Sequence, residues 1–422
     1  MTDDIDIQAT QPPDPREYSP NYELFRMQQE EPLGDLWSDE LLLSANLQNL
    51  ISQTVILPYA DIQVPVLSAY LLTPSALATV VPILYLYGSR GSGKSTIAVV
   101  ASALHRTEVF SAATTFAAAR NAFNQQRWRD PVEHEGEKNC CLVIDNINRE
   151  TLTNELLYTF LLNGYNRKTD VISIAKPGGE NTTFRVFGLK VLSSVHPLYA
   201  QSKFSELGRR CLVIKCKPFE QMIDAEKQSK HLHFDFSLAD KVNLEELDLS
   251  LLKQEFDRLW HDEGRLVDYA LVKRQLSSRK KTFKLPSQIT GARWTISVDL
   301  LTTGIVSGIW GSKEEALEAL ANYWAWYDQH VASEFGATHK LLEELILEET
   351  SNARKYNKDL GYEAYPMEIN PEKLKKHVSW ASAQGMLEVT PTPTIIAEVM
   401  ADLGWKLDKG AHGKICWIPA LK

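Results

Sequence analysis

Short apolar runs between residues 80 and 220 predict the buried strands of a parallel sheet. The runs are apolar along most of their length, without the alternation of a strand that has one wet face, and this is typical of strands covered on both faces. The segments between them have helical character, so the pattern predicts an α/β fold in which helices flank the sheet. Four strands are predicted, at Ile83–Tyr87, Cys140–Ile144, Lys190–Ser194 and Cys211–Lys215.

A second β-prone pattern, at Asp170–Phe187, consists of two runs separated by a Pro-Gly-Gly turn. Because proline and glycine end strands and favour tight turns, this segment predicts a β-hairpin inserted before the third core strand. Lys176 stands beside the turn, and Arg185 lies in the second run. A hairpin with a lysine near its tip can follow a phosphate backbone, so both residues are candidate DNA contacts.

The character of the chain changes on both sides of this core and predicts four units. Residues 1–75 comprise a proline-rich, acidic arm followed by an apolar helix, and residues 76–222 form the core. Residues 223–336 consist of charged helical segments without comparable strand patterns, and they predict a helical lid.

The last unit, residues 337–422, has the pattern of a winged helix. Three helices are followed by a hairpin with a glycine-containing, basic tip, and the hairpin carries Lys406, Lys409 and Lys414. The helices are predicted at Thr338–Glu349, Pro371–Ala383 and Thr394–Leu403. Such a unit can lie on a DNA duplex through its lysines, and a protein-interaction module is the alternative because fold alone does not fix function.

Composition restricts the classes of protein to which the chain can belong. Its 422 residues, 44% of them hydrophobic, suggest more than one domain, and no apolar run is long enough to span a bilayer. The acidic start lacks the pattern of a secretory signal, and the five cysteines show no metal-binding spacing. We therefore expect a cytoplasmic protein with reduced thiols and no structural zinc. The net charge of −9 argues against a surface that binds nucleic acid throughout, and a basic cluster between Arg265 and Lys284 is either a local exception or a solvated helix face.

A glycine-rich segment directly after the first predicted strand has the sequence of a phosphate-binding loop. Its glycines allow successive backbone N–H groups to point at phosphates, Lys94 can reach the terminal phosphates, and the Ser95 hydroxyl can ligate Mg²⁺. A helix follows at once, and its N-terminus adds attraction for anions. We therefore expect ATP and Mg²⁺ as cofactors, bound by Gly88, Ser89, Gly91, Ser92, Gly93, Lys94, Ser95 and Thr96.

The second predicted strand leads into a candidate metal ligand. Asp145 follows its apolar run and is placed to hold Mg²⁺ opposite Ser95. In many ATPases the next residue is a glutamate that deprotonates the attacking water, but here it is Asn146. An amide can orient water but cannot accept its proton, so we expect slow hydrolysis or a base from elsewhere, with Glu150 as a candidate.

Two pairs of residues lie at strand ends, where polar groups can reach a nucleotide. Ser193 and Ser194 end the third predicted strand, from which a hydroxyl can contact the γ-phosphate or the attacking water. Arg209 and Arg210 precede the fourth predicted strand, from which a guanidinium can stabilise charge on a nucleotide held by a neighbouring subunit. A turn-forming serine and a surface salt-bridge arginine are the structural alternatives.

In the order of these residues the chain resembles the AAA+ ATPases of phage, plasmid and integrated-element replication proteins, in particular the helicase part of primase-helicase proteins. The resemblance covers roughly residues 67–320. The matching segments are Gly88–Ser95, Asp145, Phe160–Arg167, Leu207–Ile214 and Gly291–Trp294. The chain departs from this pattern at Asn146, and its N-terminal segment is too short to hold a primase.

The resemblance implies a homo-oligomer, either a hexameric ring or a filament, with ATP at each subunit interface. It implies that Ser194 is a sensor at the strand end and that Arg209 or Arg210 is a finger acting on the neighbouring subunit. It also implies that Arg293 is a lid arginine that responds to the γ-phosphate. The hairpin Asp170–Phe187 is then expected to project toward single-stranded DNA.

Two functions are open on the sequence alone. The first is a helicase-like, ATP-dependent motor that acts on DNA in the replication of a mobile element. The second is an ATP switch that assembles on DNA and recruits a replication partner protein, and Asn146 favours it because hydrolysis would be slow. A phosphotransferase for a small metabolite is disfavoured because the lid and the C-terminal unit have no role there.

Overall fold

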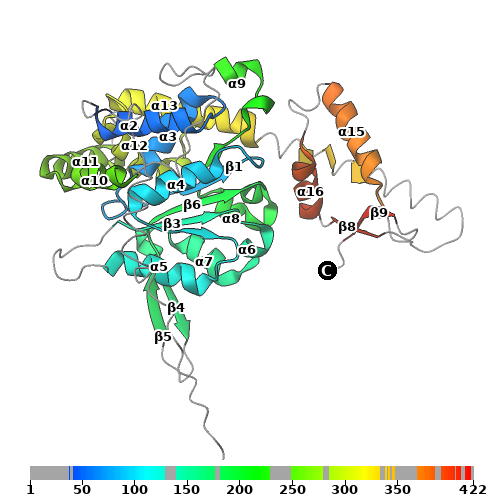
Figure 1. Cartoon of the computed structure of the whole chain (residues 1–422), viewed down its shortest axis with the longest axis horizontal. Coiled ribbons are helices and arrows are strands. Elements are labelled where there is room, and N and C mark those ends of the chain that lie inside the picture. The colour runs from blue at the N-terminus through cyan, green and yellow to red at the C-terminus, as the bar shows by residue number, and fades with distance from the viewer. Residues whose placement is uncertain are drawn as a thin grey trace, which may run out of the picture.

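The computed structural model describes a larger α/β unit and a smaller unit formed by the C-terminal segment (Figure 1). The described residues are 38, 41–128, 139–175, 181–228, 249–278, 285–332, 338–339, 341–342, 345–346, 368–384, 391–403, 405–409 and 414–419. The predicted N-terminal arm lies outside them. Each unit has a hydrophobic core of its own. A search of the described helices finds none whose length and apolar character would let it cross a membrane.

A five-stranded parallel sheet forms the centre of the larger unit, in the order β2-β3-β6-β1-β7. Its strands are β1 (Ile83–Tyr87), β2 (Val109–Ser111), β3 (Cys141–Asp145), β6 (Leu189–Ser194) and β7 (Cys211–Lys215). The four strands predicted from apolar runs are confirmed to within one residue. The edge strand β2 was not predicted, because its three residues are partly exposed and form no apolar run.

Helices cover both faces of this sheet (Figure 1), which confirms the predicted α/β class. On one face, α4 (Lys94–His105) packs against β3 and β6. On the other lie α5 (Phe116–Trp128), α6 (Arg149–Thr153), α7 (Glu155–Asn163) and α8 (Ser205–Gly208). The side chains of Asn148 and Asn154 accept hydrogen bonds from the first turns of α6 and α7, which explains where these two helices begin.

The segment before the core forms two helices, so the single leading helix expected there is wrong. They are α2 (Leu43–Thr54) and α3 (Ala60–Leu71). The break contains Pro58, which cannot donate a helical hydrogen bond, and Tyr59, whose φ of 52° is left-handed. The α3 helix packs against α12 and α13 of the lid. Its Gln63 side chain also bonds the backbone N–H and C=O of Lys215, so this segment joins the lid to β7.

The described part of the predicted lid is helical, as expected. It comprises α9 (Asp224–Gln228), α10 (Ser250–His261), α11 (Glu263–Ser277), α12 (Ala292–Val306) and α13 (Lys313–Tyr327), which continues as a π-helical turn at Asp328–Ala332. The α10 helix buries Leu252, Phe256 and Trp260, which are spaced four residues apart and therefore share one face. That helix packs against α4 of the core.

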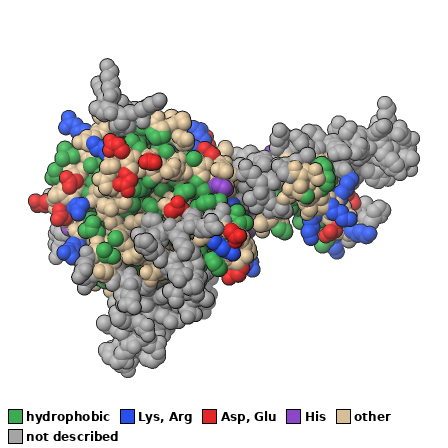
Figure 2. Space-filling model, turned by 90° about the horizontal axis from the view of Figure 1, so that it is seen from above, with side chains coloured by type: hydrophobic (Ala, Val, Ile, Leu, Met, Phe, Trp, Pro, Cys, Tyr) green, Lys and Arg blue, Asp and Glu red, His purple; other side chains and the backbone are tan. Residues whose placement is uncertain are grey.

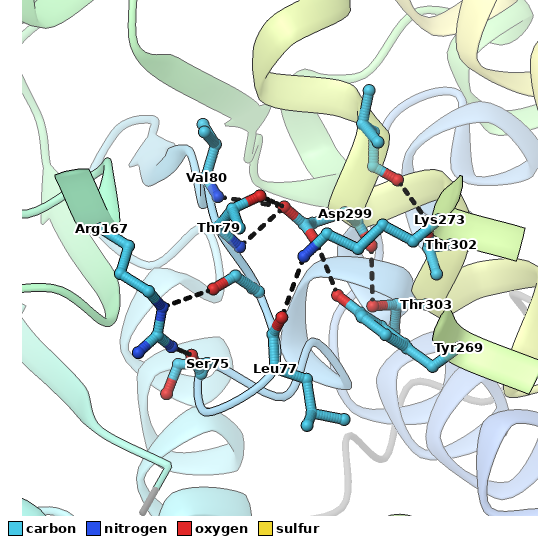
Figure 3. A network of polar contacts seen from close by, with 12 residues as sticks. Ser75, Leu77, Thr79, Val80, Arg167, Tyr269, Lys273, Asp299, Thr302 and Thr303 are labelled. Carbon is cyan, nitrogen blue, oxygen red and sulfur yellow. Dashed lines mark hydrogen bonds and ion pairs between the residues drawn. The ribbon is translucent and has the colours of Figure 1, made fainter. Parts of the chain in front are cut away.

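A buried carboxylate of the lid, paired with a lysine, joins the lid to the core through hydrogen bonds (Figure 3). Asp299 of α12 is 1% exposed, and its carboxylate lies 2.6 Å from Lys273 Nζ of α11. The same carboxylate accepts hydrogen bonds from the backbone N–H groups of Thr79 and Val80, each at 3.0 Å, and from the Tyr269 hydroxyl at 2.8 Å. A buried charge is tolerated when it is paired and hydrogen-bonded, so this joint holds the segment before β1 firmly to the lid.

The hairpin predicted before the third core strand is confirmed. It consists of β4 (Val171–Ala175) and β5 (Asn181–Arg185), paired antiparallel. In Figure 1 it projects away from the sheet. Its base lies at the end of the sheet where the strands begin, which we call the amino edge, because the chain passes from β5 directly into the start of β6. The opposite end, where the strands finish, is the carboxyl edge.

Two basic side chains tie the amino edge together. Lys190 of β6 is fully buried, and its Nζ donates to the carbonyl oxygens of Gly164, Val186 and Gly188 at 2.7, 2.9 and 3.0 Å. It therefore fixes the end of α7 and the end of the hairpin insertion to the sheet. Arg167 does the same for the segment before β1, because it donates to three of that segment's carbonyl groups at 2.5 to 2.9 Å (Figure 3).

The smaller unit contains α15 (Pro371–Ala383), α16 (Pro393–Asp402) and a hairpin of β8 (Trp405–Lys409) and β9 (Ile415–Pro419). These elements confirm the last two predicted helices and the predicted hairpin. The helix predicted at Thr338–Glu349 lies partly outside the described residues.

One side chain of the smaller unit reaches the larger one. Glu398 of α16 lies 2.8 Å from His196 Nδ1 and accepts a hydrogen bond from Gln201. Both partners belong to the loop that follows β6. The C-terminal unit is therefore attached beside the carboxyl edge of the sheet, a short distance along the chain from Ser193 and Ser194.

Candidate nucleotide-binding site

The glycine-rich loop joins the end of β1 to the start of α4, at the carboxyl edge. Gly91 and Gly93 have φ values of 74° and 88°, which residues with a side chain rarely adopt, and these turns bring the chain back to begin the helix. Lys94 is the first residue of α4, followed by Ser95 and Thr96. The N–H groups of the first helical turn have no intrahelical acceptor, so the loop has the form of an anion site.

Lys94 lies within this loop and is 5% exposed. Its Nζ donates to the carbonyl oxygens of Gly88 at 2.7 Å and Ser89 at 2.6 Å, and it lies 3.3 Å from the Ser92 hydroxyl. Burial lowers the pKa of Lys94 from its ordinary value, although nearby acidic groups oppose the shift. A desolvated ammonium at this place can interact strongly with an anion that enters the loop.

The Ser95 hydroxyl lies 2.9 Å from the Asp145 carboxylate, to which it donates a hydrogen bond. The two residues come from different elements: Asp145 ends β3, whereas Ser95 lies in the first turn of α4, which follows β1, and β6 lies between these two strands in the sheet. Carboxylate and hydroxyl oxygens are ligands that Mg²⁺ accepts. The donor set of this pair therefore fits a magnesium ion held beside the loop.

Ser193, not Ser194, is the serine of β6 that contacts Asp145. The Ser193 hydroxyl donates to Asp145 Oδ1 and accepts the backbone N–H of Asn146 at 2.9 Å. Ser194 is fully buried, donates to the Ile147 carbonyl at 2.8 Å and accepts the N–H of His196 at 3.0 Å. Successive residues of a strand face opposite sides of the sheet, so the alternation of β6 is the signal that separates the two serines.

Asn146 takes the position after Asp145 with a left-handed φ of 58° and an exposed side chain. Its Nδ2 donates to Asp145 Oδ2 at 3.2 Å. Glu150, the other candidate base, is exposed in the first turn of α6. The amide thus lies directly at the predicted metal ligand, where it can orient a water molecule but cannot take its proton.

The arginine pair stands at the amino edge, away from the loop of the same chain. Arg210 precedes β7, whose first residue pairs with the first residue of β1, whereas the loop follows the last residue of β1. Arg210 donates to the Leu162 carbonyl at 2.9 Å and stacks on Tyr165 at 4.5 Å. Arg209 is 66% exposed and makes an ion pair with Glu206 at 3.1 Å. The Arg210 side chain is 22% exposed, so Arg209 is the more accessible of the two to another molecule.

Arg293 is held within the lid. Its guanidinium forms a two-pronged ion pair with Asp328, one contact being 2.8 Å, and stacks on Trp324 at 4.5 Å. Hydrogen bonding to Asp328 raises the pKa of Arg293. Its side chain is 29% exposed. The contacts described for Arg293 are thus made inside the lid, and its approach to a nucleotide stays a prediction.

The candidate DNA contacts have different surroundings. Lys176 lies outside the described residues. Arg185 is half exposed, 3.6 Å from the buried carboxylate of Asp170 at the hairpin base. Lys409 is exposed at the end of β8.

In two basic clusters, the side chains that are exposed differ from those that the sequence alone indicated. Figure 2 shows lysine and arginine side chains gathered on the smaller unit. The exposed lysines of that unit include three on α15 that sequence reasoning missed, Lys373, Lys375 and Lys376. In the cluster between residues 265 and 284, by contrast, Lys273 is used in the lid joint and Arg265 donates to the Val306 carbonyl at 2.6 Å.

Comparisons with known proteins give limited information. No protein-family model and no curated protein sequence matches this chain. Among solved structures, the chain is similar to one described as an active helicase, Cch of SCCmec type IV, with a TM-score of 0.38 and 12% sequence identity. The match covers 89% of this chain and 69% of that chain. A similarity this distant carries no argument about function, which has to rest on the site itself.

Proposed function

We propose that this chain is a Mg²⁺-dependent ATPase that acts on DNA as a helicase-like motor of the mobile-element replication type. The observation that carries the proposal is the 2.9 Å contact between Ser95 and Asp145 beside a loop that contains Lys94. A triphosphate needs a cation, a set of backbone N–H groups and a metal ion that shares its charge. The loop, the lysine and the two oxygen donors supply places for all three.

Each residue of the site has a separate task in this proposal. The loop from Gly88 to Thr96 wraps the phosphates, and Lys94 turns from its carbonyl partners to the terminal phosphates. Ser95 and Asp145 hold Mg²⁺, which when bound neutralises charge on the transferred phosphoryl group. Asn146 orients the attacking water.

Oligomeric assembly with ATP at the interfaces is part of the same proposal. Arg209 supports it, since this exposed guanidinium stands at the edge of the sheet opposite its own loop. A five-residue strand spans about 15 Å, so the arginine is better placed for the nucleotide of a neighbouring AAA+-like subunit than for its own. Arg293 is the proposed lid arginine.

The DNA part of the proposal rests on two projecting elements. The β4–β5 hairpin carries Lys176 near its turn and Arg185 at its base, and it leaves the core at the amino edge. The helices and hairpin of the C-terminal unit support a winged-helix-like module whose exposed lysines, Lys409 among them, contact phosphates. Such contacts release counterions, so binding should weaken steeply as salt is raised.

Asn146 favours a second candidate function, an ATP switch. Its amide stands where many ATPases have a carboxylate base. ATP binding would then assemble the subunits on DNA and recruit a partner protein, and slow hydrolysis would release them.

A strand-displacement assay with a forked DNA, ATP and Mg²⁺ tests the two functions. Unwinding that is lost in Lys94→Ala supports the motor. ATP-dependent assembly on the same DNA without unwinding, measured by analytical ultracentrifugation, supports the switch. A protein that, with ATP, neither unwinds the DNA nor assembles on it refutes both.

A further inference from the structure

We infer that Ser193 is the positioning residue of the metal site, because it sets the direction of the Asp145 carboxylate. The inference rests on the proposed function and adds to it a residue that never needs to touch the nucleotide. The buried Ser193 hydroxyl contacts both the side chain of Asp145 and the backbone N–H of Asn146.

The direction of the Ser193 hydroxyl proton follows from its partners. Asn146 can only donate its backbone N–H, so the Ser193 oxygen accepts that bond at 2.9 Å. The hydroxyl proton is then left for Asp145 Oδ1, which lies in contact with it. Ser193 is fully buried, so bulk water cannot supply the same bond. One oxygen of Asp145 is therefore engaged by the sheet.

The other carboxylate oxygen is directed to the loop. Asp145 Oδ2 accepts the Ser95 hydroxyl at 2.9 Å and the Asn146 amide at 3.2 Å. A carboxylate that is held at one oxygen cannot rotate freely, so Oδ2 remains on the side of Ser95. Residues that orient a metal ligand typically contribute about 10- to 100-fold to metal affinity.

Ser193 also fixes the backbone that follows Asp145. Asn146 has a left-handed φ of 58°, a conformation that costs a residue with a side chain some free energy. Its N–H is satisfied only by the Ser193 oxygen among the contacts described. One hydroxyl thus places both the proposed metal ligand and the residue that orients water.

The test measures Mg²⁺ dependence instead of turnover. A fluorescent, non-hydrolysable ATP analogue is titrated onto the full-length protein at a series of Mg²⁺ concentrations and also in EDTA. In Ser193→Ala we expect the half-saturating Mg²⁺ concentration to rise about tenfold, with analogue affinity in EDTA unchanged. Ser193→Thr keeps a hydroxyl and should restore most of the Mg²⁺ response.

Ser194→Ala is the matched control, since it removes a neighbouring buried hydroxyl of the same strand that bonds Ile147 and His196. It should lower the melting temperature without moving the Mg²⁺ midpoint. An equal Mg²⁺ midpoint in wild type and Ser193→Ala overturns the inference while leaving the proposed function intact. Wild-type protein that binds no analogue with or without Mg²⁺ overturns the proposed function, and the inference with it.

Discussion

The carboxyl and amino edges of the sheet belong to the same five strands, yet the polar and charged side chains named at each edge have different surroundings. At the carboxyl edge, Ser95 and Asn146 are exposed and Asp145 is only partly buried. At the amino edge, Lys190 is fully buried and donates to three backbone carbonyl groups. The first edge leaves oxygen atoms open to a ligand, whereas the second satisfies its charges within the protein.

One sheet thus holds both an end that is open to a ligand and a rigid end. A buried charge without partners costs several kcal/mol, about 3 to 5 when one member of a pair is removed, so the amino edge is stable only as a complete network. At the carboxyl edge, Ser95, Asn146 and Asp145 are at least partly exposed, so their groups can exchange internal hydrogen bonds for bonds to a ligand. Arg209 is an exposed exception at the amino edge, and its side chain is 66% exposed, so it tests this division.

The largest expected effect is on turnover in Arg209→Ala. If Arg209 serves the nucleotide of a neighbouring subunit, kcat should fall about a thousandfold with ATP affinity nearly unchanged. Mixing Arg209→Ala with Asp145→Asn subunits should restore part of the ATPase rate, measured by phosphate release. Arg210→Ala, whose side chain bonds Leu162 and Tyr165, should mainly lower the melting temperature. If the ATPase rate does not recover in confirmed mixed oligomers, Arg209 does not act on a neighbouring subunit.

The next effect is on stability at the lid joint. Asp299→Ala leaves Lys273 and the N–H groups of Thr79 and Val80 without their shared acceptor, so the free energy of unfolding should fall by about 3 kcal/mol in urea denaturation. Asp328→Ala removes the half-exposed partner of Arg293 and should cost below about 1 kcal/mol. Equal losses of unfolding free energy in the two variants would contradict the expectation that a buried ion pair is more costly to break than an exposed one.

Lys94→Ala, at the carboxyl edge, should weaken nucleotide binding without a comparable loss of stability. Loss of the ammonium removes charge-assisted bonds to phosphate, so affinity for a fluorescent ATP analogue should fall by about a hundredfold, or about 2.7 kcal/mol. The melting temperature without nucleotide should change little. Lys203→Ala, an exposed lysine elsewhere in the core, serves as the control. Unchanged affinity for the analogue in Lys94→Ala would contradict the proposal that this loop binds the nucleotide.

A smaller effect, a loss of stability on acidification, should come from the far end of α4. Burial lowers the pKa of His105 to about 4, whereas in the unfolded chain the imidazole has its ordinary pKa of 6.5. Below pH 6.5 the unfolded state binds the extra proton, so stability is lost as pH falls from 6.5 toward 4, by about 2 kcal/mol at pH 5. His105→Gln should lose less stability than wild type between pH 7 and pH 5. Identical pH profiles in thermal unfolding would contradict the prediction.

The sequence predicted the parts of the fold that have a local chemical pattern. The four longer strands gave unbroken apolar runs, and the hairpin at Asp170–Phe187 gave two runs around a Pro-Gly-Gly turn, so both are confirmed. The contact between Ser95 of α4 and Asp145 of β3 joins residues fifty positions apart, yet it was expected, because the segments that follow parallel strands meet at the carboxyl edge of the sheet.

Other features depend on packing and could not be predicted. Nothing in the pattern indicated that Lys190, inside a predicted strand, would be buried against three carbonyl groups, because those carbonyls come from α7 and the hairpin base. The joint at Asp299 likewise depends on how the lid docks. Ser193 and Ser194 are chemically identical in sequence, and only the side of the strand on which each lies distinguishes them.

The most direct test of the central claim is a crystal structure of the protein with Mg²⁺ and a non-hydrolysable ATP analogue. We expect phosphates within the loop Gly88–Ser95, with Mg²⁺ about 2.1 Å from the Ser95 hydroxyl and Asp145 coordinated to it directly or through water. Analogue density at another place, or within the loop but with its metal ion away from both Ser95 and Asp145, would contradict it.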